Sequence, residues 1–292
     1  MKAFWWSPIR MPRTIREEVR GSSVMWARQS ARTGRPFTNF GDELSRYALE
    51  YAFRTKISWS RPQSADILGI GSILDFYLLA GARGAVVWGT GSRDGNVSHD
   101  GEARALQFSK VLAVRGPRTR DALGCSDRLP MGDPGVLAAK LAADGRRRSK
   151  VARRTLLPHF RSWSSPEGVA CIKEASKEGF SIIYPTDSPT RVIRKIMDSD
   201  VLLSSSLHGI IVAHSVGTPV IPVNLERDGS ESRFKFEDYF ATVRSEYKPL
   251  DLKEVLSPRF VKYAEESVAS APDFEEITSQ IADALISVAR RA

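Results

Sequence analysis

The sequence predicts an α/β fold with two parallel β-sheets. The apolar segments expected to be strands are continuous runs rather than alternating ones, which is typical of parallel strands buried on both faces. Helical patterns lie between them, and in the helix expected over residues 43–54 Leu44, Tyr47, Ala48 and Tyr51 share one stripe. This alternation of strands and helices indicates two Rossmann-like domains. The strands are expected at residues 66–70, 85–88, 111–114, 155–157, 181–184, 201–203 and 219–223, and further helices at 117–123, 190–197 and 210–216.

A change in composition marks where the two domains meet. Residues 144–154 are polar and strongly basic and have no apolar period. We therefore expect an N-terminal Rossmann-like domain over residues 1–145 and a second one over residues 150–250. Residues 251–292 carry apolar side chains at helical spacing, so we expect C-terminal helices that pack back on the body of the protein.

Composition and cysteine content point to a cytoplasmic protein. The chain has 292 residues, of which 42% are hydrophobic and 26% charged, as in folded soluble proteins. No apolar run is long enough to cross a bilayer, and residues 1–9 lack the apolar core of a signal peptide. Cys125 and Cys171 match no metal-binding or redox spacing, so we interpret them as buried thiols in a reducing compartment.

The net charge of +9 is compatible with nucleic acid, anionic lipid or phosphorylated substrates. Basic residues gather in residues 10–35 and 146–154, but neither stretch has a zinc-finger spacing, an RNA-recognition signature or an aromatic-basic platform. We therefore expect no nucleic-acid partner. The nearby aromatic cluster of Phe4, Trp5 and Trp6 is interpreted as core packing, with membrane contact as the alternative.

Glycine-rich turns follow the first two expected strands. Residues 69–72 read Gly-Ile-Gly-Ser and residues 89–92 read Gly-Thr-Gly-Ser. Ligands bind outside the carboxyl ends of strands in open α/β sheets, and glycines let the backbone approach them closely. Neither turn matches a dinucleotide fingerprint or a phosphate loop. Tight turns would explain each alone, but their equivalent positions suggest a shared cleft floor.

Two further polar groups lie at element ends in the first half. Arg115 directly follows the third expected strand, where its guanidinium can form paired hydrogen bonds to a carboxylate or phosphate. A surface salt bridge is the alternative interpretation. Asp42, which precedes the first clear helix, can cap that helix or hold a hydroxyl of a substrate.

The sharpest signal is the run Ser-Ser-Ser-Leu-His-Gly over residues 204–209. It joins the strand at 201–203 to the helix at 210–216, so hydroxyls and a helix N-terminus together make an anion site. His208 could there donate a hydrogen bond to phosphate or move a proton. Serines that only cap the helix are the alternative. His159 also lies at a strand end, whereas His214 is expected in the core and His99 in a polar loop.

Together these motifs resemble those of the polysaccharide pyruvyl transferases, especially the exopolysaccharide type. The resemblance spans residues 39–239. Its motifs, in order, are Asn39-Phe40-Gly41-Asp42, Gly69-Ile70-Gly71-Ser72, Gly89-Thr90-Gly91, Val114-Arg115-Gly116-Pro117-Arg118, Gly132-Asp133-Pro134, Pro158-His159, Ser206-Leu207-His208-Gly209 and Arg233-Phe234-Lys235-Phe236-Glu237-Asp238-Tyr239.

The resemblance implies an architecture and a reaction. The fold would be similar to that of GT-B glycosyltransferases, with two domains facing a cleft, the first on the acceptor side and the second on the donor side. Phosphoenolpyruvate would be the donor and a saccharide the acceptor, with a pyruvate ketal formed and phosphate released. No metal and no further cofactor are implied. We expect a lipid-linked acceptor, and therefore peripheral contact of residues 10–35 with the inner face of the cell membrane.

The resemblance also implies roles for residues. Arg115 and His208 would serve the donor, with His208 as general acid and Asp42 or His159 as base. Many members carry an Arg two residues before the His, where this chain has Ser206. Arg118, His159 or Lys235 could supply the missing charge. The expected binding residues are Asn39, Gly41, Gly71, Ser72, Gly91, Arg118, His159, Ser205, Ser206, Leu207, Gly209 and Lys235.

Two other functions fit the same pattern. A glycosyltransferase with a nucleotide-sugar donor would share the architecture and would use an acidic residue such as Glu226 or Glu237 for the ribose or sugar. A non-catalytic protein that binds a phosphorylated glycan is consistent with Ser206. Release of phosphate from phosphoenolpyruvate distinguishes the three. The sequence identifies neither the acceptor sugar and linkage nor the oligomeric state.

Overall fold

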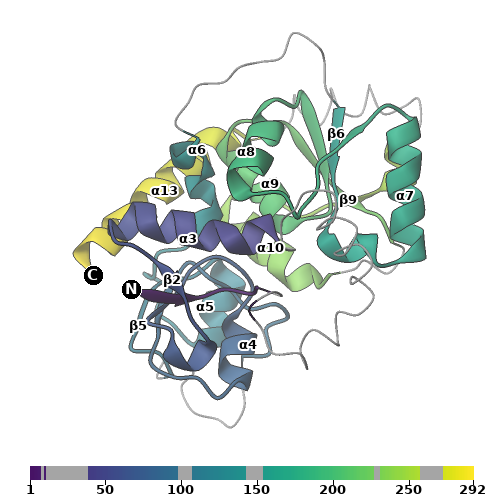
Figure 1. The fold of residues 1–292 in the computed structure, drawn as a ribbon. Helices are drawn as coiled ribbons and strands as arrows, with labels where there is room; N and C mark the ends of the chain where they lie inside the picture. The colour runs from purple at the N-terminus through teal and green to yellow at the C-terminus, as the bar shows by residue number, and fades with distance from the viewer. Residues whose placement is uncertain (8–9, 11–38, 98–106, 143–153, 227–230, 257–271) are drawn as a thin grey trace.

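A computed structural model describes residues 1–7, 10, 39–97, 107–142, 154–226, 231–256 and 272–292. It contains two separate parallel sheets of five strands each, with helices around them (Figure 1). The predicted mixed α/β fold with two parallel sheets is confirmed. The basic stretch at residues 144–154, where we expect the domains to meet, lies outside the described residues except for Arg154.

The first sheet has the strand order β2-β1-β3-β4-β5, and all neighbouring strands pair in parallel. Helix α4 (Leu74–Leu79) packs through Leu74 and Tyr77 on one hydrophobic core of this half. Helix α5 (Pro117–Leu123) follows the last strand. The strands are β1 (Lys2–Phe4), β2 (Ser58–Trp59), β3 (Ile67–Leu68), β4 (Val86–Trp88) and β5 (Lys110–Ala113), and a short helical turn, η2, spans Pro62–Ser64.

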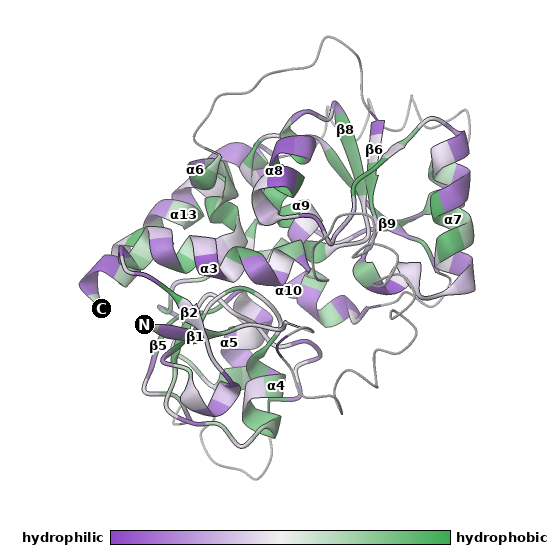
Figure 2. Ribbon diagram, in the orientation of Figure 1, coloured by the Kyte–Doolittle hydropathy of each residue, from purple (hydrophilic) through white to green (hydrophobic). Residues whose placement is uncertain are grey.

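The second sheet has the order β10-β9-β8-β6-β7, again with parallel pairing throughout. Helices α7 and α8 are amphipathic, and in Figure 2 they alternate between hydrophobic and hydrophilic residues while β8 is mainly hydrophobic. The strands are β6 (Arg154–Leu157), β7 (Ser181–Ile182), β8 (Val201–Ser204), β9 (Val220–Asn224) and β10 (Leu250–Asp251). The helical segments are η5 (Phe160–Trp163), α7 (Pro166–Lys177), α8 (Pro189–Met197), α9 (Leu207–Ser215) and α11 (Leu252–Val255).

Five helical segments join the two halves. Helix α3 (Phe40–Phe53) runs between the sheets and contacts α8 and the final helix α13 (Phe274–Arg291) (Figure 1). The short segments η4 (Pro134–Leu137) and α6 (Ala138–Leu141) lie against α3 and α9. Helix α10 (Arg233–Thr242) lies between β9 and β10 of the second sheet in the chain but packs on α5 of the first half. One large core therefore runs through both halves.

Two smaller expectations can be checked here. Both cysteines are free thiols, but Cys125 is half-buried, whereas Cys171 is buried as expected. In the part of the chain that the structure describes, no helix is long and apolar enough to cross a membrane.

Candidate functional site

A pocket of about 720 Å³ is lined by residues from both halves of the chain. It lies at the carboxyl ends of the strands, since it takes in residues from the segments that follow β3, β4, β6 and β8, within two to five residues of each strand end. It brings together eight of the predicted site residues: Asn39, Asp42, Ser72, His159, Ser206, Leu207, His208 and Lys235. The other lining residues are Trp6, Ile73, Asp75, Phe76, Leu79, Arg93, Asp94, Phe160, Arg161, Ser164 and Glu231.

Two helices begin at this pocket. Asn39 is the N-cap residue of α3 and Ser206 that of α9, and both line the pocket. The first-turn N–H groups of a helix have no acceptor within the helix, and they carry the positive end of its dipole. A Cβ atom on Gly41 would overlap the imidazole of His208, so the two helix ends touch through a position that only glycine fits. The pocket is therefore suited to a negatively charged ligand.

The serine run holds the turn that presents His208. Ser204 Oγ donates to Leu157 O at 3.0 Å and accepts from Ser206 N at 3.1 Å. Ser205 Oγ accepts from His159 N at 2.8 Å, which ties the end of β6 to the end of β8. A Cβ on Gly209 would overlap Ser204 Oγ. Ser204, Ser205 and Gly209 thus shape the turn, and Ser206 and His208 face the pocket.

His208 is neutral in this environment. Burial, together with the positive charges of Lys235 and Arg115 and the neighbouring His159, lowers its pKa from 6.5 to about 3. Its Nε2 is buried and has no hydrogen-bond partner among the described residues. A buried polar atom without a partner is costly, which indicates that a ligand or water binds there. An anion beside His208 would raise its pKa again.

Asp42 is a titratable group of the pocket whose pKa lies close to neutrality. Its side chain is buried, and Asn39 Nδ2 donates to Asp42 Oδ2 at 2.6 Å. Burial raises the pKa of Asp42 from 3.8 to about 7, and the neighbouring Glu43 adds to this, while the hydrogen bond from Asn39 and the charge of Lys235 oppose it. A carboxyl with this pKa can both accept and donate a proton near neutral pH.

A cluster of three cations surrounds the carboxylate of Glu231. Lys235 Nζ lies 2.6 Å from Oε2, Arg161 Nε lies 3.0 Å from Oε1, and Arg93 Nη2 lies 3.9 Å from Oε2. Burial lowers the pKa of Lys235, and the charge of Glu231 opposes that shift. Burial would raise the pKa of Glu231, but the charges of Lys235 and Arg161 hold it well below its usual range.

His159 lies beside this cluster without adding a charge to it. Burial lowers its pKa to about 3, although Glu231 opposes the shift. Its Nδ1 accepts a hydrogen bond from Arg161 N at 3.4 Å, which a neutral ring can do. The 3.5 Å approach of Nδ1 to Glu231 Oε1 is therefore not an ion pair.

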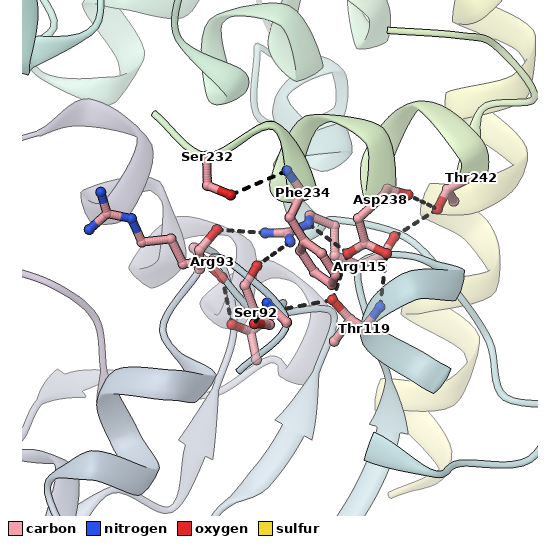
Figure 3. A network of polar contacts seen from close by, with 12 residues as sticks. Ser92, Arg93, Arg115, Thr119, Ser232, Phe234, Asp238 and Thr242 are labelled. Atoms are coloured by element: carbon pink, nitrogen blue, oxygen red, sulfur yellow. Dashed lines mark hydrogen bonds and ion pairs between the residues drawn. The ribbon is translucent and has the colours of Figure 1, made fainter. Parts of the chain in front are cut away.

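Arg115 lies behind the pocket wall and does not line it. Its side chain is fully buried, and Nε pairs with Asp238 Oδ2 at 3.0 Å (Figure 3). Nη1 donates to Ser72 Oγ at 2.7 Å and Nη2 to Ser92 O at 2.5 Å, so it reaches the pocket only through Ser72. The surface salt bridge considered from sequence is wrong, because this pair is buried.

The predicted glycines and Arg118 have simpler surroundings. A Cβ on Gly91 would overlap the guanidinium of Arg115, and Gly71 has a φ of 113° that favours glycine. Arg118 is half exposed and pairs with Glu237 at 2.8 Å, outside the pocket. His214 is a core residue, as predicted, with its Nδ1 3.0 Å from the hydroxyl of Tyr239.

Sequence reasoning missed several lining residues. Arg93 and Arg161 each come one or two residues after a motif that was recognised, so extending the strand-end rule would have found them. Trp6 was interpreted as core, but it lines the pocket and stacks on Phe160 with ring centroids 5.1 Å apart. Nothing in the sequence singles out Glu231. Among the described residues, no group of three His, Cys, Asp or Glu side chains is placed to hold a metal ion.

Comparison with known proteins assigns the chain to a family. The family model described as polysaccharide pyruvyl transferase matches residues 26–227. Over 215 residues the chain is 28% identical to the succinoglycan biosynthesis protein ExoV of Rhizobium meliloti. This match covers 72% of this chain and 63% of ExoV. Over 126 residues it is 29% identical to an uncharacterized protein of Acanthamoeba polyphaga mimivirus, covering 41% of this chain and 43% of that protein. The chain thus spans less than two thirds of the length of these relatives.

Proposed function

Because the chain belongs to the polysaccharide pyruvyl transferase family, we propose that it transfers pyruvate from phosphoenolpyruvate to a saccharide of an exopolysaccharide or cell-surface glycan. The similarity to a succinoglycan biosynthesis protein supports an exopolysaccharide as the acceptor. The observation that carries the proposal is the concentration of cationic groups and helix N-termini around one pocket between the two sheets. Phosphoenolpyruvate has a carboxylate and a phosphate, and both need such partners.

The reaction determines which protons must move. Two hydroxyl groups of the acceptor form bonds to the central carbon of phosphoenolpyruvate, and the bond from that carbon to the phosphate oxygen breaks. One hydroxyl proton is delivered to the vinyl carbon, which becomes a methyl group, and the other leaves with the phosphate. The products are a pyruvate ketal and inorganic phosphate. The site must therefore supply an acid, a base and a stabilised oxocarbenium-like transition state.

Asp42 and His208 are the groups best placed for these steps. Asp42, with its pKa of about 7, accepts the proton of an acceptor hydroxyl. His208 is neutral in the free protein. It can give up a proton only after the negatively charged phosphoenolpyruvate has raised its pKa. His159 is the alternative base. Arg115 supports the site from behind through Ser72.

The finer architecture belongs to the same proposal. We assign residues 1–145 to an acceptor-side domain, 150–250 to a donor-side domain and 251–292 to C-terminal helices, in a GT-B-like arrangement. The two separate sheets and the pocket between them support it. The contacts of α13 with α3 and β5 support the return of the C-terminal helices to the first half. We further propose a lipid-linked acceptor and a cytoplasmic location.

The two alternative functions have less support. A nucleotide-sugar glycosyltransferase was expected to use Glu226 or Glu237, and neither lines the pocket. Glu226 instead accepts from Ser165 Oγ at 3.0 Å, and Glu237 pairs with Arg118 and Arg233. A non-catalytic glycan-binding protein would not need a buried carboxyl such as Asp42, whose pKa is close to neutral.

Phosphate release tests the proposal directly. Purified protein, phosphoenolpyruvate and candidate lipid-linked oligosaccharides should yield phosphate together with a ketal detectable by mass spectrometry. His208→Ala should lower turnover by about 100-fold or more, the scale of a lost acid-base group. Arg46→Ala, on an exposed side chain of α3, is the control. Release of nucleotide from a nucleotide sugar, with no phosphate from phosphoenolpyruvate, would instead establish the glycosyltransferase.

A further inference from the structure

The three-cation cluster already binds a carboxylate, that of Glu231. Lys235 and Glu231 are both nearly buried, with side chains 9% and 7% exposed. The three cations come from three different segments: Arg93 follows β4, Arg161 lies in η5 and Lys235 lies in α10. They converge inside the pocket from both halves of the chain, and three positive charges face one negative charge. The cluster therefore has the charge and the spacing to hold a carboxylate group.

Each arginine of the cluster can be reached from solvent. The side chains of Arg93 and Arg161 are 42% and 45% exposed, although both line the pocket. Burial of a charged group is costly unless it is paired, so the nearly buried Lys235 needs a counter-ion when no ligand is bound. Glu231 supplies it. The side chain precedes the N-cap residue Ser232 of α10, so it can turn away without breaking a hydrogen bond of the helix.

We propose that Glu231 occupies the subsite for the carboxylate of the ligand and exchanges with it when the ligand binds. Lys235, Arg161 and Arg93 form this carboxylate subsite. The phosphate of the same ligand then lies toward Ser206 and His208, at the N-terminus of α9. The identity of the ligand as phosphoenolpyruvate rests on the proposed function, whereas the exchange itself concerns any small carboxylate that fits the pocket.

Exchange makes Glu231 an internal competitor, so its charge sets how tightly carboxylates bind. With Glu231→Gln the side chain keeps its size but no longer competes as an anion. Pyruvate, which has a carboxylate and no phosphate, is the probe, and its dissociation constant is measured by calorimetry. We expect pyruvate to bind Glu231→Gln at least about tenfold more tightly than the unaltered protein, the scale of one charged hydrogen bond.

Glu237→Gln is the matched control, since Glu237 lies on the adjoining helix α10 and also pairs with two basic residues, but outside the pocket. Its pyruvate affinity should be unchanged. In the double variant Glu231→Gln with Lys235→Met, the gain should be lost because the subsite has lost its nearest cation. Should Glu231→Gln fail to fold, Glu231→Asp replaces it, because the shortened carboxylate pairs less well and pyruvate should again bind more tightly.

Three results would overturn the exchange: no gain in the folded Glu231 variant, an equal gain in Glu237→Gln, or a gain that survives the loss of Lys235. The binding measurement needs neither acceptor nor turnover. A protein that shows the gain but releases no phosphate from phosphoenolpyruvate would retain the subsite and refute the proposed function. A protein that transfers pyruvate but shows no gain in pyruvate affinity would support the proposed function and refute the exchange.

Discussion

Gly41 lies directly against the imidazole of His208, so closely that a single added methyl group would overlap the ring. Gly41 is in the first turn of α3 and His208 in the first turn of α9. The residue after Gly41 is Asp42, whose pKa is raised to about 7 by burial. The contact therefore sets the distance between the two groups to which we assign the proton transfers.

Gly41→Ala should disturb this contact and lower activity. The Cβ pushes His208 out of its place, and displacement of about 1 Å at a reacting group can cost about 100-fold in rate. Overpacking of this kind also costs about 1–3 kcal/mol of stability. The measurements are kcat/KM from phosphate release and urea unfolding, with Arg46→Ala as the control on the same helix. Full activity in a folded Gly41→Ala protein would show that His208 does not need this position.

Removal of either partner of the Arg115–Asp238 pair should destabilise the protein. Asp238 also accepts from Thr119 N at 3.0 Å and from Thr119 Oγ1 at 2.6 Å, so its carboxylate joins α10 to α5. Loss of one partner leaves an uncompensated buried charge, at a cost of about 3–5 kcal/mol. We expect this for Arg115→Ala and Asp238→Ala in urea unfolding.

The matched control for that pair is Arg118→Ala. Arg118 of α5 pairs with Glu237, which lies next to Asp238 in α10, but Arg118 is half exposed. Its cost should be about 0–1 kcal/mol. Equal stability of Arg115→Ala and Arg118→Ala would contradict the structural role of the buried pair. It would also restore the simpler interpretation of Arg115 as a group that only binds the donor.

Asp42 makes stability depend on pH in a defined direction. Burial raises its pKa from 3.8 to about 7, so between these values the folded protein keeps a proton that the unfolded chain has lost. The contribution of Asp42 to stability is therefore present at low pH and falls as pH rises toward 7. Asp42→Asn should flatten this decline in unfolding free energy, whereas Asp283→Asn, at an exposed position, should leave it unchanged.

The same titration should appear in the kinetics. If Asp42 accepts a proton from the acceptor, kcat/KM should rise with pH through about 7 and then level off. Asp42→Asn should lower kcat/KM by at least about 100-fold and remove this limb. A variant that keeps the limb would assign the base to another group, with His159 as the next candidate.

Membrane contact is predicted through the basic residues of the 10–35 stretch, nearly all of which lies outside the described residues. Each basic side chain near an anionic surface adds about 1 kcal/mol, and salt screens the attraction. The protein should therefore sediment with phosphatidylserine-containing vesicles at low salt and be released at high salt. Equal binding to neutral vesicles would contradict an electrostatic contact.

The seven strands expected from continuous apolar runs are all present, with ends shifted by up to two residues. The three others, β1, β2 and β10, were not predicted: the aromatic cluster at the end of β1 was interpreted as core packing, and β2 and β10 each combine one apolar and one polar residue. These three short strands are recognised by their hydrogen-bonded pairing with neighbouring strands. Helix α3 begins at Phe40, three residues before the predicted start, because Gly41 and Asp42 are poor helix formers and hide that start in the sequence.

The site was partly predictable for a similar reason. Asp42, His159 and His208 lie at element ends, and the strand-end rule depends only on local sequence. The burial of Arg115 depends on Asp238, which is 123 positions away in the chain. The ion pairs of Glu231 depend on cations that three separate segments of the chain contribute. No local pattern contains such information.

The return of α10 and α13 to the first half has a consequence for synthesis on the ribosome. Trp88 Nε1 donates to Leu285 O, 197 positions later, and Arg115 Nε donates to Asp238 Oδ2, 123 positions later. A nascent chain that has emerged only as far as α5 has neither partner, so Trp88 lacks its contact with α13 and Arg115 lacks its carboxylate partner. Contacts this distant in sequence slow folding. The first half therefore completes its packing after translation has passed α13, and we expect the growing chain to depend on chaperones until then.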